Sequence, residues 1–371
     1  MSSHITTEQK AYELWIYRQA GRSWLALADQ QQIYCLDVSL DHIARFTGNR
    51  YCAQIIDKDQ ALGAVRVNLG SKTACNSTAH VGLLDINAST KEAIAAGLEL
   101  QVGRYIHVEC LNEPRENKGA KLKLFNHDNG QEFKRIRDWS NPAKALFLRY
   151  KSSIAQIFTN SPKVLKEVSA WNGGRKTSIL RSDDQRWQRL FDCLSSARSS
   201  NVTCANLASL LIEPVRTLTA IDINSAGNDP FAANMAAVPH LAEQIRLRNL
   251  SGLIVIDALS MKPREQRLKF DEALALSLSQ PSPFGAGIAR QDISAMDKNG
   301  VVILHRRRQG FALHEQDPAA MRALDYLALL TQDQQPLPEQ PSLHQALFEG
   351  ILKPAYAEAR GLQRLNAQAL K

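Results

Sequence analysis

Five short β-rich runs between residues 50 and 125 constrain the fold of this chain most strongly. Gly, Asn, Lys and Asp residues separate the runs, which are YCAQIIDKD, GAVRVNLG, VGLLDI, RYIHVECL and KLKLF. Short runs bounded by such turn residues predict strands, and five strands in so little sequence are typical of a small barrel of the OB type. The stretch from Ser89 to Val102 interrupts the runs and is expected to form a helix or a loop.

The rest of the chain changes pattern several times, which predicts more than one domain. Residues 11–46 favour two or three strands, whereas residues 140–200 favour helices whose starts carry Asn-Pro and Ser-Pro signals. Residues 208–305 alternate between strands and helices, as in an α/β layer with a mixed sheet. Residues 316–371 favour helices broken by the Pro-rich segment QQPLPEQPS. The expected fold class is therefore α+β, mixed and multidomain.

Bulk properties narrow the class of protein. The chain has 371 residues, 44% hydrophobic, and its net charge of +8 either attracts polyanions or only keeps the surface solvated. No apolar run reaches the roughly 20 residues that span a bilayer, and the N-terminus lacks the apolar core of a signal peptide, so we expect a cytoplasmic protein without a membrane partner. The six cysteines show no CxxC spacing, which argues against a zinc knuckle.

The segments LTAIDINSAGND and SGLIVIDALSM carry the most informative carboxylates. Alternate residues of a strand share one face, so Asp222 and Asn224 are expected to point the same way. Asp257 closes the apolar run GLIVI and is expected at that strand's end. Two carboxylates at neighbouring strand ends suit a hard cation, although an Asp there can also simply cap the following turn or helix.

The same two segments resemble the catalytic region of the ribonuclease E/G family, densely from Leu218 to Met261. The resemblance implies that Asp222 and Asp257 bind catalytic Mg²⁺ and that Asn224 supports the site. It also implies cleavage of RNA into products with 5′-phosphate and 3′-hydroxyl ends.

The resemblance implies a domain plan as well. Residues 47–125 are similar to the family's S-one type OB domain, and ENKGAKL at 116–122 makes Lys118 an RNA-contacting lysine, unless it is only a solvated turn residue. Residues 1–46 and 126–207 would form a split RNase H-like subdomain around the barrel, residues 208–315 a DNase I-like catalytic subdomain, and residues 316–371 a helical tail.

Several departures from the family pattern qualify these expectations. The segment that holds the family's 5′-monophosphate sensor is missing, so end sensing is not expected. Arg66 and Leu83 stand where the barrel's RNA-stacking aromatics would be, and Arg66 could stack its guanidinium plane or contact phosphate instead. The zinc-binding link is missing, so no zinc-linked tetramer is expected, although a homo-oligomer is possible.

Three consecutive arginines follow the last predicted strand. Arg306, Arg307 and Arg308 align with a basic tract of the family and are expected to bind RNA phosphate, or else to form a solvated edge. Three successive side chains cannot all face one way, so at least one is expected to face solvent.

The sequence thus predicts a Mg²⁺-dependent endoribonuclease that processes or degrades single-stranded RNA without end sensing. Asp222 and Asp257 would hold a metal ion that binds a phosphate oxygen and activates a water molecule. The main alternative is a non-catalytic RNA-binding protein descended from such an enzyme. A third possibility is a scaffold joined to a degradation complex through residues 316–371.

Overall fold

The computed structural model describes residues 11–19, 22–40, 45–70, 81–114, 119–205, 208–215, 217–280, 286–308 and 310–315. Lys118 and the tail from residue 316 lie outside these ranges. The chain divides into two compact units, one made of residues 44–145 and 308–311 and the other of the remaining residues. Among the described helices, none is long and apolar enough to cross a bilayer.

The first unit is a small barrel. Its strands are β4 (Arg50–Asp59), β5 (Ala64–Asn68), β6 (Val81–Asp85), β7 (Tyr105–Cys110), β8 (Ala120–Gly130) and β9 (Lys134–Arg137). They run in the order β5-β6-β8-β7-β4-β9, and β4 also pairs with β5, so five strands close on themselves. Only β6 and β8 pair in parallel. This closed five-stranded barrel is consistent with the predicted OB-like fold.

Strand β7 shows how alternate side chains build the interior of the barrel. In β7 the side chains of Ile106, Val108 and Cys110 point inward and are buried, while those between them point outward. The helix α1 (Ala88–Ala95) falls in the stretch expected to be a helix or loop, and the side chain of Asn87 caps it by accepting from the backbone N–H of Thr90. Along β7, every second side chain therefore points out of the barrel.

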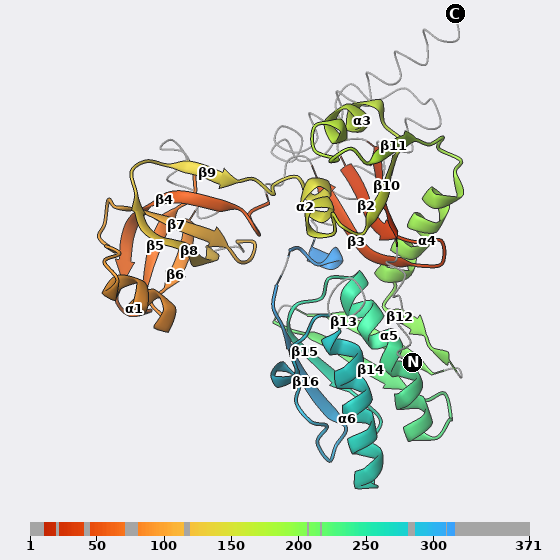
Figure 1. Ribbon diagram of the computed structural model, residues 1–371. Helices are drawn as coiled ribbons and strands as arrows, with labels where there is room; N and C mark the ends of the chain where they lie inside the picture. Colours follow the sequence, from red (N-terminus) through yellow and green to blue (C-terminus); the bar gives the residue numbers. More distant parts are fainter. Residues whose placement is uncertain are drawn as a thin grey trace, which may run out of the picture. The chain divides into compact units, whose positions relative to one another are not determined.

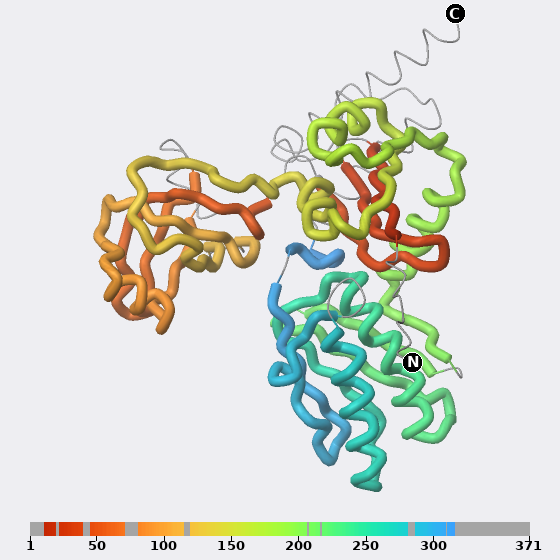
Figure 2. The backbone as a smooth tube through the Cα atoms, in the orientation of Figure 1, coloured from red at the N-terminus to blue at the C-terminus, as the bar shows by residue number. Residues whose placement is uncertain are grey.

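The second unit begins with a sheet drawn from two separate parts of the sequence. The strands β1 (Tyr12–Gln19), β2 (Arg22–Ala28) and β3 (Ile33–Leu40) form an antiparallel meander. After the barrel sequence, β10 (Ile154–Thr159) joins β1 in parallel and β11 (Lys176–Ile179) joins β10 in parallel. Figure 2 shows the red and yellow-green segments meeting in this sheet. In the sequence, the residues of the barrel thus lie between the two halves of one sheet.

The helices of this region are α2 (Pro142–Arg149), α3 (Pro162–Ser169) and α4 (Gln185–Arg198). As the Asn-Pro and Ser-Pro signals predicted, Asn141 accepts from the backbone N–H of Lys144, and Ser161 accepts from that of Val164. The prediction that helix continues through IAQIF was wrong, because these residues form β10. The side chains of Ile154 and Phe158 lie on one face of this strand and are buried. Pairing with β1 overrides the local helical pattern.

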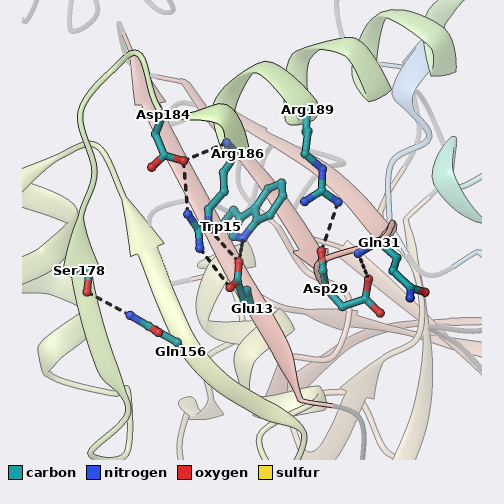
Figure 3. A network of polar contacts seen from close by, with 9 residues as sticks. All are labelled: Glu13, Trp15, Asp29, Gln31, Gln156, Ser178, Asp184, Arg186 and Arg189. Carbon is teal, nitrogen blue, oxygen red and sulfur yellow. Dashed lines mark hydrogen bonds and ion pairs between the residues drawn. The ribbon is translucent and has the colours of Figure 1, made fainter.

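A half-buried polar network fastens α4 to β1 (Figure 3). The guanidinium of Arg186 donates to both carboxylate oxygens of Glu13, over 2.9 and 3.3 Å. Glu13 also accepts from the indole N–H of Trp15 at 2.7 Å, and Arg186 lies 4.1 Å above the ring of Phe158. Asp184 caps the helix and contacts Arg186 from the other side. Each charged side chain of this network pairs with one of opposite charge, so the network has a structural role.

The remaining sheet carries the residues of interest. Its strands are β12 (Asn201–Thr203), β13 (Ser209–Pro214), β14 (Thr219–Asn224), β15 (Gly252–Asp257) and β16 (Val301–Arg306), in that order. Only β14 and β15 are parallel, which confirms the predicted mixed sheet. The helices α5 (Pro230–Leu247) and α6 (Arg264–Ser279) cover one face (Figure 1). The short helices η3 (Arg290–Asp292) and η4 (Leu313–Glu315) complete this part.

The core of this layer explains why its strands look so apolar in sequence. Ile221 and Ile223 of β14 and Ile254 and Ile256 of β15 are buried in one cluster with the side chains of α5 and α6. The side chains between them must point to the other face, where Leu253 is 38% exposed and Ile303 is 48% exposed. Pro239 lies inside α5, which continues through it to Leu247. The sheet thus has one covered face and one open face.

Candidate catalytic site

The parallel pairing of β14 and β15 places Asp222 directly opposite Asp257. Neighbouring strands lie about 4.8 Å apart, and residues paired in register in a parallel sheet point to the same side. Because Ile221, Ile223 and Ile256 point into the core, both aspartates project from the open face. Asp222 is half-buried and Asp257 is exposed. The apolar neighbours of both aspartates belong to the other face of the sheet.

Asn224 lies two residues beyond Asp222 on the same face. Its side-chain N–H donates to a carboxylate oxygen of Asp222 over 2.9 Å. Within the described part of the chain, Asp222 and Asp257 take part in no salt bridge, so no arginine or lysine competes for their carboxylates. Both groups can therefore accept a cation.

The donor set fits a hard divalent cation. Carboxylate and amide oxygens are the ligands that Mg²⁺ prefers, and Mg²⁺ commonly keeps several waters beside one or two carboxylates. Among the described residues, no group of three or more His, Cys, Asp or Glu side chains gathers as a metal site. Waters and substrate phosphate would complete the shell of an ion held by Asp222 and Asp257.

The turn after β14 fixes where Asp229 lies. Ala226 and Gly227 adopt positive φ values of 48° and 85°, and the carboxylate of Asp229 accepts from the backbone N–H of Ala232 at 3.0 Å. Asp229 is therefore the N-cap of α5. This is the simple capping role that the sequence left open for each aspartate, and it falls to Asp229 rather than to Asp222.

Two residues outside the motifs hold the end of β15 in place. Asn234 of α5 is fully buried, and its side chain donates to the carbonyl of Leu259 and accepts from that residue's N–H. Gly300 accepts from the N–H of Ala258 and has a φ of 100°. A Cβ at Gly300 would lie 2.0 Å from the carbonyl oxygen of Ala258. Sequence reasoning missed both, although an Asn within an Ala-rich helix was a visible signal.

The three consecutive arginines, Arg306 to Arg308, differ in burial. Arg306 is 4% exposed, and its guanidinium donates to Ala286 O, Leu250 O and the side-chain oxygen of Asn249. The structure contradicts its assignment to RNA binding, because these internal acceptors take its donors. Burial also lowers the pKa of Arg306 to about 10. Arg307 is exposed, as at least one of the three had to be, and Arg308 is half-buried and belongs to the barrel unit.

The barrel residues singled out by sequence also differ in accessibility. Arg66 is about half exposed and forms an ion pair of 3.0 Å with Asp59 and a longer one of 3.9 Å with Asp57. Leu83 is its cross-strand partner, so both residues lie on one outer surface. Lys118 lies outside the described residues. The guanidinium of Arg66 is accessible to solvent, although the carboxylates of Asp57 and Asp59 already compensate its charge.

A second outer surface of the barrel, which sequence reasoning missed, combines aromatic rings with cations. The guanidinium of Arg50 lies 4.8 Å above the ring of Phe125, and the ring of His107 meets that of Phe125 edge-on at 5.7 Å. Arg50, Lys123 and Arg137 surround Glu109, which leaves a net positive charge. Hydrogen bonding to Arg50 and the nearby cations outweigh burial and lower the pKa of Glu109. We call Arg50, His107, Lys123 and Phe125 the barrel platform.

Comparisons with known proteins point to one family. The model of the Ribonuclease E/G family matches residues 131–309 of this chain. Ribonuclease E of Nostoc sp. is 27% identical over 259 residues, which cover 64% of this chain and 35% of that protein. Ribonuclease E of Escherichia coli (strain K12) is 34% identical over 229 residues, which cover 57% of this chain and 20% of that protein.

Ribonuclease E of Synechocystis sp. is 27% identical over 185 residues, 45% of this chain and 27% of that protein. The alignments therefore span about a third or less of the length of each of these three relatives. The family match contains the whole of β14 and β15, and so both aspartates of the site.

Replacing Gly300 tests whether the end of β15 is held as described. The substitution Gly300→Ala forces a Cβ against Ala258 O, and we expect it to lower the free energy of unfolding by about 3 kcal/mol or more. Gly227→Ala is the matched control, because Gly227 also has a positive φ but has nothing within 4 Å of a Cβ. The control should cost only about 1–2 kcal/mol of backbone strain. Urea unfolding measures both, and equal costs would show that Gly300 does not restrain Ala258.

Proposed function

We propose that this chain, a member of the ribonuclease E/G family across residues 131–309, is a Mg²⁺-dependent endoribonuclease that cleaves single-stranded RNA. The observation that carries the proposal is the in-register pairing of Asp222 with Asp257 on an open sheet face. An RNA-binding protein has no need of two adjacent carboxylates where phosphate must approach, because unpaired like charges weaken such binding.

Each residue of the site has its own role in the proposed reaction. Bound Mg²⁺ would supply a Lewis acid for a non-bridging phosphate oxygen and lower the pKa of an attacking water, which gives 5′-phosphate and 3′-hydroxyl products. Asp222 and Asp257 would hold the ion from adjacent strands. The amide N–H of Asn224 fixes one oxygen of Asp222, so that the carboxylate keeps one orientation. Asn234 and Gly300 position the strand end that carries Asp257.

The surrounding architecture fits the subdomains that the family implies. We assign an RNase H-like subdomain to the sheet β11-β10-β1-β2-β3, supported by its antiparallel meander, its two parallel strands and the barrel inserted between them. We assign a DNase I-like subdomain to the sheet β12–β16 with α5 and α6. The segment that holds the family's 5′-end sensor is missing from the sequence, and only α2 and β10 separate β9 from α3. Cleavage without 5′-end sensing is therefore part of the same proposal.

We further propose that single-stranded RNA contacts the barrel through the barrel platform. Bases stack on aromatic rings, and cations follow the phosphate backbone. The platform offers both, because Phe125 and His107 lie beside Arg50 and Lys123. Arg66 on the neighbouring surface and the exposed Arg307 are further candidate phosphate contacts.

The second candidate function is RNA binding without catalysis. The barrel platform favours it, because that surface could bind RNA whether or not the carboxylates act. The two functions differ in what the aspartates do, so substitution of the aspartates separates them.

The decisive activity test uses an internally labelled, AU-rich single-stranded RNA with Mg²⁺ or with EDTA. Asp222→Asn and Asp257→Asn should each slow cleavage about a hundredfold or more, because several kcal/mol of transition-state stabilisation depend on the metal. Asn224→Ala should slow cleavage about tenfold, because it removes a hydrogen bond to the charged carboxylate of Asp222. The exposed Glu272 of α6 provides the control Glu272→Gln, which should keep full activity.

The same assay on 5′-monophosphate, 5′-triphosphate and circular RNAs tests end sensing, and equal rates are expected. If the wild-type protein does not cut any of them, while the aspartate variants bind RNA as well as or better than it does, the protein is an RNA binder.

Substitution of Phe125 tests the barrel platform. Phe125→Ala should weaken binding of a short single-stranded RNA about tenfold, since stacking is worth roughly 1–3 kcal/mol per base. Leu62 is 64% exposed in the turn between β4 and β5, so Leu62→Ala removes an exposed apolar side chain elsewhere on the barrel. Fluorescence anisotropy measures both, and equal affinities of the two variants would place the RNA on another surface.

A further inference from the structure

A buried arginine at the end of α5 lacks a counter-ion. Arg248 is the C-cap residue of that helix and is 5% exposed. Its Nε donates to the side-chain oxygen of Gln244 at 2.9 Å, and its Nη2 donates to the carbonyl of Ser199 at 2.7 Å. Both acceptors are neutral. Within the described residues no carboxylate pairs with this guanidinium, and Nη1 donates to no acceptor.

The absence of a counter-ion is costly at this position. A guanidinium carries five N–H donors, and removing its charge from water is unfavourable unless an anion compensates. Burial alone lowers the pKa of Arg248 to about 10, with no acid to oppose the effect. The group nevertheless stays charged at neutral pH, so a bound anion would be stabilised beside it.

Arg248 lines a cavity of about 200 Å³. Ile212 and Leu250 form part of its apolar wall, and Arg198, Ser200 and His314 also line it. Arg198 is exposed in the last turn of α4 and forms no ion pair with any residue that the structure describes. Two arginines, one buried and one accessible, therefore line the cavity.

This cavity is separate from the catalytic carboxylates. Pro214, which also lines it, pairs with Thr219 at the first residue of β14, and Leu250 precedes β15. Asp222 and Asp257 lie toward the other ends of these strands. A ligand in the cavity would not occupy the place of the RNA bond that is cut.

We infer that this cavity is a binding site for a phosphoryl group. The planar fork of a guanidinium matches phosphate oxygens in pairs, and two arginines favour a dianion over a carboxylate with a single charge. The volume is below the roughly 300 Å³ at which pockets for drug-sized ligands begin, so it admits a phosphoryl group rather than a whole nucleotide. The group comes from free phosphate or from a phosphate of bound RNA.

Titration of the full-length protein with inorganic phosphate at constant ionic strength tests the site, with chloride and acetate as comparison anions. Isothermal calorimetry should show saturable binding of phosphate and weaker binding of acetate. Arg248→Met should weaken phosphate binding about tenfold or more, as expected for loss of a charge-assisted hydrogen bond. Arg198→Ala, on the surface, should weaken it about threefold without unfolding the protein. Arg264→Ala removes an exposed charge of α6 as the control and should change nothing.

Competition identifies the source of the phosphoryl group. If a short RNA lacking terminal phosphates displaces inorganic phosphate, the site receives the RNA backbone; if it does not, the ligand is a free phosphate compound. Wild-type protein that binds phosphate no better than chloride would overturn the inference. Arg198→Ala and Arg264→Ala with the same phosphate affinity as each other would also overturn it.

Discussion

The pairing of β14 with β15 is the constraint on which the rest of this account depends. Parallel strands need a crossover, and α5 supplies it while covering the face opposite to the carboxylates. The same pairing buries four isoleucines toward the helices and turns Asp222 and Asp257 outward together. A slip of one residue in either strand would send one carboxylate into the core. Burial of the isoleucines on one face of the sheet therefore fixes the positions of the two carboxylates on the other face.

The buried arginines show that positive charge in this chain has two separate uses. Arg306 and Arg186 are held by internal acceptors and join distant segments, so their guanidinium groups have a structural role. Arg50 and Arg307 remain accessible and suit phosphate contact. Arg248 is the intermediate case, because it is buried like the structural arginines but has no acid to balance it. Net charge alone could not distinguish these roles.

Sequence reasoning anticipated the parts of the fold that follow from local alternation. The barrel strands, the caps at Asn141 and Ser161, and the strands that carry Asp222 and Asp257 all follow from patterns within a few residues. The failures involve partners that are distant in the sequence. Residues 154–159 form a strand because β1 lies beside them, and Arg306 is buried because Asn249 and Ala286 accept its donors. Asn234 could be recognised as a positioning residue only once its contact with Leu259 was known.

Metal binding by single and paired variants of the two aspartates tests the central claim most directly. Mn²⁺ shares the preference of Mg²⁺ for oxygen ligands and can be counted by electron paramagnetic resonance. If Asp222 and Asp257 hold one ion together, Asp222→Asn and Asp257→Asn should each abolish most of the binding. The double variant should then bind no more weakly than either single variant, because the two effects are not additive. Additive losses in the double variant, or Mn²⁺ affinity unchanged in either single variant, would contradict a shared site.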